Sequence, residues 1–260
     1  MNKSYETLVR DLKEIGVREG DFLVVHSSLK SMGEVEGGAE CVIKALCDVI
    51  GKDGTLMLPT FTYIPSYDEL FYSNKDTPSC VGIITETFRK QEGVIRSNHP
   101  THSVAIKGPL TSVLLKDEEL GDTPMGEYSP YGKLHKYNAK ILLLGCHFGR
   151  NSFMHAVEEM GNAVYALRGH AEYTVINEKG ESSKRRIKRH NFVRDGGVIA
   201  QRYERALDVL SEGEFKTGTI HGATSVLMSA TALREKALKK MEEKPLYFVD
   251  DLGGFYPELK

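Results

Sequence analysis

Hydrophobic and polar positions along the first half of the chain predict alternating helices and buried strands. Leu8, Leu12 and Ile15 recur at spacings of four and three within residues 4–15, which is the pattern of an amphipathic helix. An apolar run at 21–28 (DFLVVHSS) ends in small polar residues, as is typical of a buried strand that leads into a loop. An apolar-faced helix over 37–51 and another buried strand over 54–63 follow. This order of strand, loop, helix and strand predicts a parallel α/β layer.

The pattern continues less regularly up to Gly161. We expect a helix over 84–93, then a strand over 94–108 that is interrupted by Pro100. A third buried strand, over 140–146, leads through a glycine-containing loop into a helix over 152–161. The prediction is therefore an α/β fold in which helices flank a central, mostly parallel sheet.

Beyond Gly161 the pattern changes. Residues 171–197 predict a β-hairpin, because Tyr173 and Val175 suggest a strand and residues 178–180 suggest a turn. A helix is expected over 225–243, before the apolar segment 245–251. Since no repeat, low-complexity block or linker interrupts the chain, we predict a single domain over 1–260. Its core is expected over 1–160, and a hairpin-containing elaboration with the C-terminal helix is expected over 161–260.

Composition excludes several classes of protein. The 260 residues are 40% hydrophobic and 27% charged, which suffices for a sizeable buried core. A formal net charge of −2 and the absence of Trp argue against nucleic acid or an anionic membrane as a partner. No apolar run approaches the roughly 18 residues of a transmembrane helix, and the charged N-terminus shows no secretory signal. We expect a cytoplasmic protein.

Cysteines and paired histidines give little indication of a metal. The four cysteines, at 41, 47, 80 and 146, form no CxxC pair and predict buried free thiols. Cys146 lies beside His147, but it ends an apolar strand, which favours a buried thiol over a nucleophile. His99 and His102 form an HxxH motif with no carboxylate or thiol at ligand spacing, so we predict no metal cofactor.

The helix predicted over 152–161 carries the most informative polar residues. Ser152, His155 and Glu158 follow one another at spacings of three, which places them near one face of the helix. A neutral imidazole is a suitable base for an amine nucleophile, and a carboxylate one turn away can orient its ring. The helix N-terminus offers N–H groups where an oxyanion could develop. The same spacing is common in helices without catalytic function. The alternative that His155 is an ordinary helix histidine therefore stays open at this point.

Five motifs occur in an order that is far more specific than any one of them. They are HSSL followed by a glycine pair within 24–38, GTLMLPTFTY at 54–63, RSxHPxxS within 94–108, SPYGKL at 129–134 and (S/T)xxHxxE within 141–159. The series resembles the aminoglycoside 3-N-acetyltransferase family from about Val24 to Glu159. The resemblance implies an α/β fold distinct from other acetyltransferase folds, with acetyl-CoA as donor and direct attack by the acceptor amine.

The same resemblance assigns roles to particular residues. It implies that His155 is the catalytic base, that Glu158 is its partner, and that Ser152 places a hydroxyl near the thioester where the family usually has Thr. The core over 1–160 would bind acetyl-CoA, and 161–260 would lie on the acceptor side. The residues implied to bind acetyl-CoA are His26, Ser27, Ser28, Leu29, Ser31, Gly33, Arg96, Ser97 and Ser103.

The residues alone leave alternatives open at both parts of this donor site. A strand that ends in small hydroxyl residues can present backbone N–H groups to phosphate, but the same composition suits a plain strand-to-loop turn. Arg96 either pairs with a CoA phosphate or bonds a carboxylate within the core.

The family resemblance implies acidic loops after the catalytic helix, because carboxylates bind a polycationic drug. The stretch 184–194 departs from this expectation, since it is basic. Its basic side chains are Lys184, Arg185, Arg186, Lys188, Arg189, His190 and Arg194. This cluster favours an anionic acceptor such as a nucleotide-linked amino sugar, bound by Arg186, Arg189 and His190. The alternative is a solvated hairpin edge that is protected by charge.

Three functions are therefore consistent with this sequence. The main expectation is an N-acetyltransferase for a nucleotide-linked amino sugar, and the alternative is an aminoglycoside 3-N-acetyltransferase that confers antibiotic resistance. A CoA-binding protein without catalysis is the third, and the intact set of Ser152, His155 and Glu158 argues against it. In each case the partner is a small molecule, and a homodimer is one option for the oligomeric state.

Overall fold

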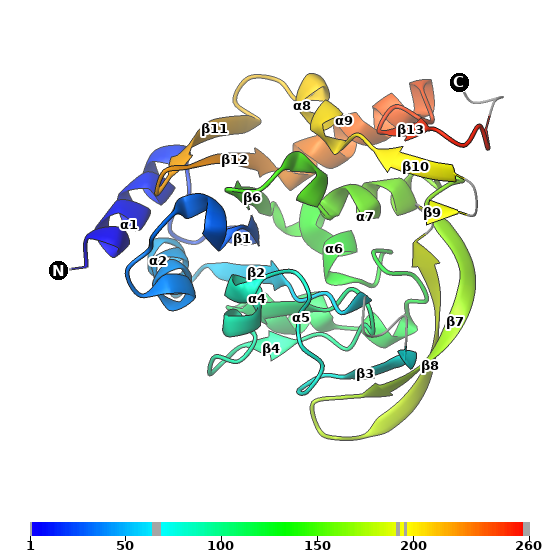
Figure 1. The fold of residues 1–260 in the computed structure, drawn as a ribbon, viewed down its shortest axis with the longest axis horizontal. Helices are drawn as coiled ribbons and strands as arrows, with labels where there is room; N and C mark the ends of the chain where they lie inside the picture. Colours follow the sequence, from blue (N-terminus) through cyan, green and yellow to red (C-terminus); the bar gives the residue numbers. More distant parts are fainter. Residues whose placement is uncertain (1, 64–68, 191–192, 195–196, 257–260) are drawn as a thin grey trace.

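A computed structural model describes residues 2–63, 69–190, 193–194 and 197–256 (Figure 1), with only the backbone described at 193–194 and 197–198. Its helices are α1 (Lys3–Ile15), α2 (Gly38–Ile50), α4 (Ile83–Phe88), α5 (Thr111–Leu115), α6 (Pro130–Lys133), α7 (Phe153–Met160), α8 (Ala206–Val209) and α9 (Ala230–Glu243). Its strands are β1 (Phe22–Ser27), β2 (Thr55–Pro59), β3 (Phe71–Ser73), β4 (Ile95–Arg96), β5 (Val104–Lys107), β6 (Lys140–Leu144), β7 (Leu167–Ile176), β8 (Ser182–His190), β9 (Val193–Arg194), β10 (Gly197–Gln201), β11 (Phe215–Ile220), β12 (Ala223–Ser229) and β13 (Val249–Asp251).

The centre of the molecule is a seven-stranded sheet in the order β11-β12-β6-β1-β2-β5-β4. Strands β6, β1 and β2 are parallel to one another, and the strands outside them pair antiparallel. The parallel strands are buried throughout most of their length, as their continuous apolar runs predict. The expected α/β class, with helices flanking a central sheet, is confirmed.

Helices cover both faces of this sheet, because side chains of each strand alternate between two cores. Leu23 and Val25 of β1 pack in one core with apolar residues of α1 and α2, whereas Val24 packs in the other with residues of α7 and α9. Figure 1 shows α1 and α2 apart from α6, α7 and α9, consistent with these two layers.

The register of the parallel strands brings two loops together. Ser27 at the end of β1 is paired with Leu144 at the end of β6, so the loops that follow both strands start side by side. The short 3-10 helix η1 (Leu29–Met32) lies in the first loop, and its Ser31 hydroxyl donates to the Gly145 carbonyl of the second at 2.5 Å. Ligands of parallel α/β sheets bind at such carboxyl ends.

Three predicted elements differ from the structure. The helix expected over 225–243 begins only at Ala230, because 223–229 form β12, which pairs antiparallel with β6. Ser229 marks the boundary, since its side chain accepts a hydrogen bond from the Ala232 N–H and caps the helix. The helix expected over 84–93 ends at Phe88, and the strand expected over 94–108 is divided into β4 and β5, with Pro100 between them.

The predicted hairpin is confirmed as β7 and β8, which curve along one side of the molecule (Figure 1). His190, the last residue of β8, stacks on His155 of helix α7. Residues 161–260 also provide β11 and β12, so this half completes the central sheet as well as adding the hairpin. Among the described residues, no helix combines the length and apolarity needed to cross a membrane.

Candidate active site

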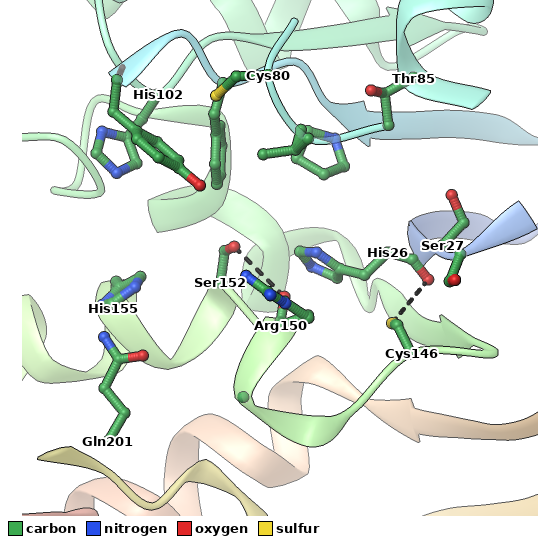
Figure 2. A pocket seen from close by; sticks show the side chains of 16 residues that line it. His26, Ser27, Cys80, Thr85, His102, Cys146, Arg150, Ser152, His155 and Gln201 are labelled. Carbon is green, nitrogen blue, oxygen red and sulfur yellow. Dashed lines mark hydrogen bonds between the residues drawn. The ribbon is translucent and has the colours of Figure 1, made fainter. Parts of the chain in front are cut away.

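A cavity of about 480 Å³ opens at the carboxyl ends of β1 and β6. Its lining includes His26, Ser27 and Ser28 from the first strand and loop, and Ser152 and His155 from the start of α7. Figure 2 shows the His26 ring pointing from the end of β1 toward Ser152. The structure therefore brings part of the predicted donor site to one cavity with Ser152 and His155.

Helix α7 begins in a way that fixes the position of His155. Asn151 is fully buried, and its side-chain oxygen accepts the Phe153 N–H at 3.3 Å, which caps the first turn. Ser152 stands at the N-cap position, and its hydroxyl lies 3.5 Å from the Arg150 carbonyl. Because Phe153, Met154 and the next turn are buried against the sheet, the helix presents His155 to the cavity.

His155 is held along one edge by a carboxylate and a tyrosine. Its Nδ1 lies 3.3 Å from Glu158 Oε2 and 2.8 Å from the Tyr203 hydroxyl, which itself donates to Glu158 Oε2 at 2.8 Å. Tyr165 donates to the other oxygen, Oε1, at 3.2 Å. Glu158 is completely buried, so its charge depends on these donors. With Nδ1 directed at this pair, Nε2 is the ring nitrogen that would accept a proton from a substrate.

Tyr203 and Tyr165 contact the predicted catalytic pair, and sequence reasoning missed both. Tyr203 comes from the short 3-10 helix η5 (Tyr203–Arg205), 48 positions after His155, and no spacing rule connects them. Burial, followed by the charge of Glu158, raises the pKa of Tyr203 well above its usual value. The hydroxyl therefore remains a proton donor to Glu158 at neutral pH. Arg150 and Gln201, which also line the cavity, were likewise not predicted.

His190, which was expected to bind the acceptor, lies against the catalytic residues. Its ring stacks on that of His155, with centroids 4.5 Å apart and planes at 30°. Its Nε2 lies 2.9 Å from Oε1 of the neighbouring Glu159. His102 contacts the same imidazole edge-on at 4.7 Å and also lines the cavity. Burial lowers the pKa of both His190 and His102 well below the usual value.

Only part of the predicted donor site lines the cavity. His26 is buried there, and desolvation together with the nearby His155 lowers its pKa to about 3, so the imidazole is neutral at neutral pH. Ser27 and Ser28 also line the cavity. Leu29, Ser31 and Gly33 belong to the turn around η1: Ser31 ties this turn to Gly145, and Gly33 ends it with a φ of 69°. In the described part of the chain these three support the cavity wall rather than line it.

The expectation that Arg96, Ser97 and Ser103 bind acetyl-CoA is not supported by their positions. All three are buried, with exposures of 5%, 1% and 0%. The Arg96 guanidinium donates to the backbone carbonyls of Thr60, Asn74 and Thr77, while Ser97 and Ser103 bond backbone groups beside it. This arginine satisfies buried carbonyls of the protein, and it contacts neither a core carboxylate nor the cavity among the described residues.

The basic stretch lies on β8, and two of its side chains contact the segment 98–122, outside the hairpin. Arg185 donates to the carbonyls of Asn98, Glu118 and Gly121. Arg186 is exposed and stands opposite Glu172 in the β7–β8 register.

Lys188 and Arg189 complete the described part of this stretch. Lys188 pairs with Asp122 at 3.6 Å, and Arg189 stands opposite Arg168. The Arg194 side chain lies outside the described residues. Of the described basic residues in 184–190, only His190 contacts the catalytic histidine, so the geometry favours a solvated edge over an anion site.

Cysteine and metal chemistry gain no support here. All four cysteines are free, and burial raises the pKa of Cys146, which lines the cavity, to about 11. Its thiol is thus protonated at neutral pH, and it donates to the His26 carbonyl at 3.4 Å. Among the described residues, no group of three or more His, Cys, Asp or Glu is placed to hold a metal ion.

Relatives of the chain were found by sequence. A prophage-derived aminoglycoside N(3')-acetyltransferase-like protein of Bacillus subtilis is 33% identical over 177 residues, and aminoglycoside N(3)-acetyltransferase VIII of Streptomyces fradiae is 33% identical over the same length. These matches cover 60% of this chain, and they span 65% and 60% of the two relatives, which is less than two thirds of their length. Aminoglycoside N(3)-acetyltransferase VII of Streptomyces paromomycinus is 28% identical over 266 residues, or 91% of each chain.

Solved structures and a family model extend these similarities to most of the chain. The crystal structure of the YokD protein from Bacillus subtilis superimposes with a TM-score of 0.78 and 27% identity, covering 95% of this chain and 96% of that one. A mutant of aminoglycoside acetyltransferase AAC(3)-IVa, in complex with gentamicin, has a TM-score of 0.80 and 25% identity, covering 94% and 90%. The model of the family described as aminoglycoside 3-N-acetyltransferase matches residues 24–242. The chain therefore belongs to the aminoglycoside 3-N-acetyltransferase family.

Proposed function

We propose that this protein transfers the acetyl group of acetyl-CoA to an amine of an aminoglycoside, with His155 as the general base. The observation that carries the proposal is the shared cavity, where His26, Ser27 and Ser28 of the donor motif face Ser152 and His155. Membership of the family and the names of the relatives support the same reaction.

The geometry accounts for each step of the transfer. The acceptor nitrogen attacks the thioester carbon while His155 Nε2 accepts a proton from the amine, so a C–N bond forms and the C–S bond breaks. The proton then passes to the departing thiolate, which leaves as CoA. Glu158 and Tyr203 hold Nδ1 and stabilise the positive charge that His155 gains during attack. We propose that the Ser152 hydroxyl, at the N-cap of α7, lies near the thioester oxygen.

Acetyl-CoA would enter from the side of the cavity formed by the loop after β1. His26 stays neutral, and the small side chains of Ser27 and Ser28 leave room for the acetyl and thioester groups. The exposed Arg150 lines the same cavity and could pair with a phosphate group of CoA.

For the acceptor, the observations favour an aminoglycoside over a nucleotide-linked amino sugar, which is not supported. The relatives are named for aminoglycosides, and one structural relative is described in complex with gentamicin. In the basic stretch that suggested a diphosphate, two side chains contact the protein itself: Arg185 donates to three backbone carbonyls and Lys188 pairs with Asp122.

A panel of acceptors tests the proposal. We expect release of CoA thiol, together with a product that is heavier by one acetyl group, from a kanamycin-type or gentamicin-type aminoglycoside. A nucleotide-linked amino sugar under the same conditions serves as the comparison, and we expect no product from it. If no amine in the panel releases thiol while acetyl-CoA still binds, the protein is a CoA-binding protein without catalysis and the proposal fails.

A further inference from the structure

The catalytic helix carries two consecutive carboxylates that serve different imidazoles. Glu158 lies three positions after His155 and contacts its Nδ1, whereas Glu159 lies four positions after it and turns toward the hairpin. There Oε1 of Glu159 accepts the Met125 N–H at 2.9 Å and meets His190 Nε2 at the same distance. The two side chains of this second pair have exposures of only 6% for the histidine and 4% for the carboxyl.

The second pair supports the face of the catalytic ring. His190 stacks on His155 at 4.5 Å, while Tyr203 meets the edge of His155 at 5.4 Å and 80°. His102 in turn contacts His190 edge-on at 4.7 Å and 72°, which also limits the movement of that ring. Stacking on one face adds to the contacts at Nδ1 and opposes a tilt of the His155 ring.

We propose that Glu159 and His190 are positioning residues that hold the His155 ring at the orientation needed for proton transfer. This inference rests on the proposed role of His155 as base. It gives His190 a different role from acceptor binding: His190 acts through the catalytic imidazole, and Glu159 acts through His190. It also links the hairpin to catalysis, since β8 ends at His190 and the catalytic helix supplies its partner.

The charges around the pair are consistent with this passive role. Burial raises the pKa of Glu159 to about 7 and lowers that of His190, so one proton shared by the pair leaves it without net charge near neutral pH. The other titratable groups facing it from the described elements are His155 on α7, His99 and His102 between β4 and β5, and Asp122 before Met125. A neutral pair beside the base permits His155 to gain its proton during attack.

Kinetics of four variants distinguish positioning from acceptor binding. In His190→Ala, kcat should fall by about tenfold with KM for both substrates nearly unchanged, and His190→Phe should recover much of it because a flat ring remains. In Glu159→Leu, kcat should fall similarly, and Glu159→Gln should recover activity because an amide oxygen can still accept both N–H groups. Arg186→Ala, on the exposed part of the same strand, is the matched control and should not change kcat. A higher acceptor KM with unchanged kcat in His190→Ala would show that His190 binds the acceptor and would overturn the proposal.

A measurement without substrate keeps this test separate from the proposed function. Carbon-13 relaxation at the His155 ring Cε1–H bond reports how well the ring is fixed, and comparison with His155→Asn assigns the signal. The order parameter should fall in His190→Ala and Glu159→Leu and recover in His190→Phe and Glu159→Gln. An unchanged order parameter in folded His190→Ala would refute the positioning role even if the protein is an active acetyltransferase. Conversely, a protein that acetylates no amine but shows this pattern would refute only the proposed function.

Discussion

Replacing Tyr203 with Phe removes one hydroxyl that contacts both members of the catalytic pair. The side chain is fully buried, so Phe occupies the same space and the change is confined to two hydrogen bonds of 2.8 Å, to His155 Nδ1 and to Glu158 Oε2. A hydrogen bond to a charged group contributes about 1.5–3 kcal/mol. Because Glu158 keeps Tyr165 on its other oxygen, we expect the lower half of this range for stability.

The effect on catalysis should be similar in size to the effect on folding. If the lost bonds cost about 1.4–2.8 kcal/mol of transition-state stabilisation, kcat/KM falls about ten- to hundredfold.

Steady-state turnover with acetyl-CoA, measured across pH for the wild type and the variant, provides the assay. Tyr165→Phe is the matched control, since it removes the other hydroxyl from Glu158 without touching His155. We expect it to cost similar stability and less than about threefold in kcat/KM. Equal losses of kcat/KM in the two variants would refute the assignment of Tyr203 to the base.

Further predictions concern the donor loop, the buried arginine and acid stability. Ser28→Leu should raise the apparent KM for acetyl-CoA much more than that for the acceptor, and equal effects would place the donor elsewhere. Arg96→Met should lower the free energy of unfolding by about 3 kcal/mol or more, because it leaves buried carbonyls without donors. The affinity of the folded variant for acetyl-CoA should not change. A selective loss of this affinity would show that Arg96 binds a phosphate of CoA. Burial lowers the pKa of five histidines below the value in the unfolded chain: His26, His99, His102, His135 and His190. Below about pH 6.5 these histidines are protonated in the unfolded chain but not in the folded one. Urea unfolding should therefore show that the free energy of unfolding falls as the pH is lowered from about 7.5 to 5.5, by about 1.4 kcal/mol per pH unit for each net proton. Glu159, with a pKa raised to about 7, opposes this by one proton, so equal or greater stability at the lower pH would contradict the assigned burial.

The sequence predicted those parts of the fold and site that depend on local patterns. Buried strands β1, β2 and β6 were recognised because each is a continuous apolar run with small residues or glycine at its end. Ser152, His155 and Glu158 could be placed together because one helical period relates them. The boundary between β12 and α9 was missed, since the apolar residues before Ser229 continue smoothly into a helical pattern and only pairing with β6 decides their structure.

The remaining features depend on contacts between distant segments. Tyr203 meets His155 across 48 positions, and His190 meets Glu159 across 31, so neither partner is visible in a spacing. For Arg96 the residue type was uninformative, because an arginine that binds phosphate and one that satisfies buried carbonyls have the same sequence signature. Burial alone separates them, and here it favours the carbonyls.

Comparison of His155→Ala with the wild type tests the central claim most directly. Calorimetry should show acetyl-CoA binding nearly intact in the variant, because the donor residues of β1 and its loop are untouched. Turnover with an aminoglycoside acceptor should fall by about a hundredfold or more, which is the usual contribution of a general base. Near-normal turnover in His155→Ala, at any pH where the wild type is active, would contradict the account.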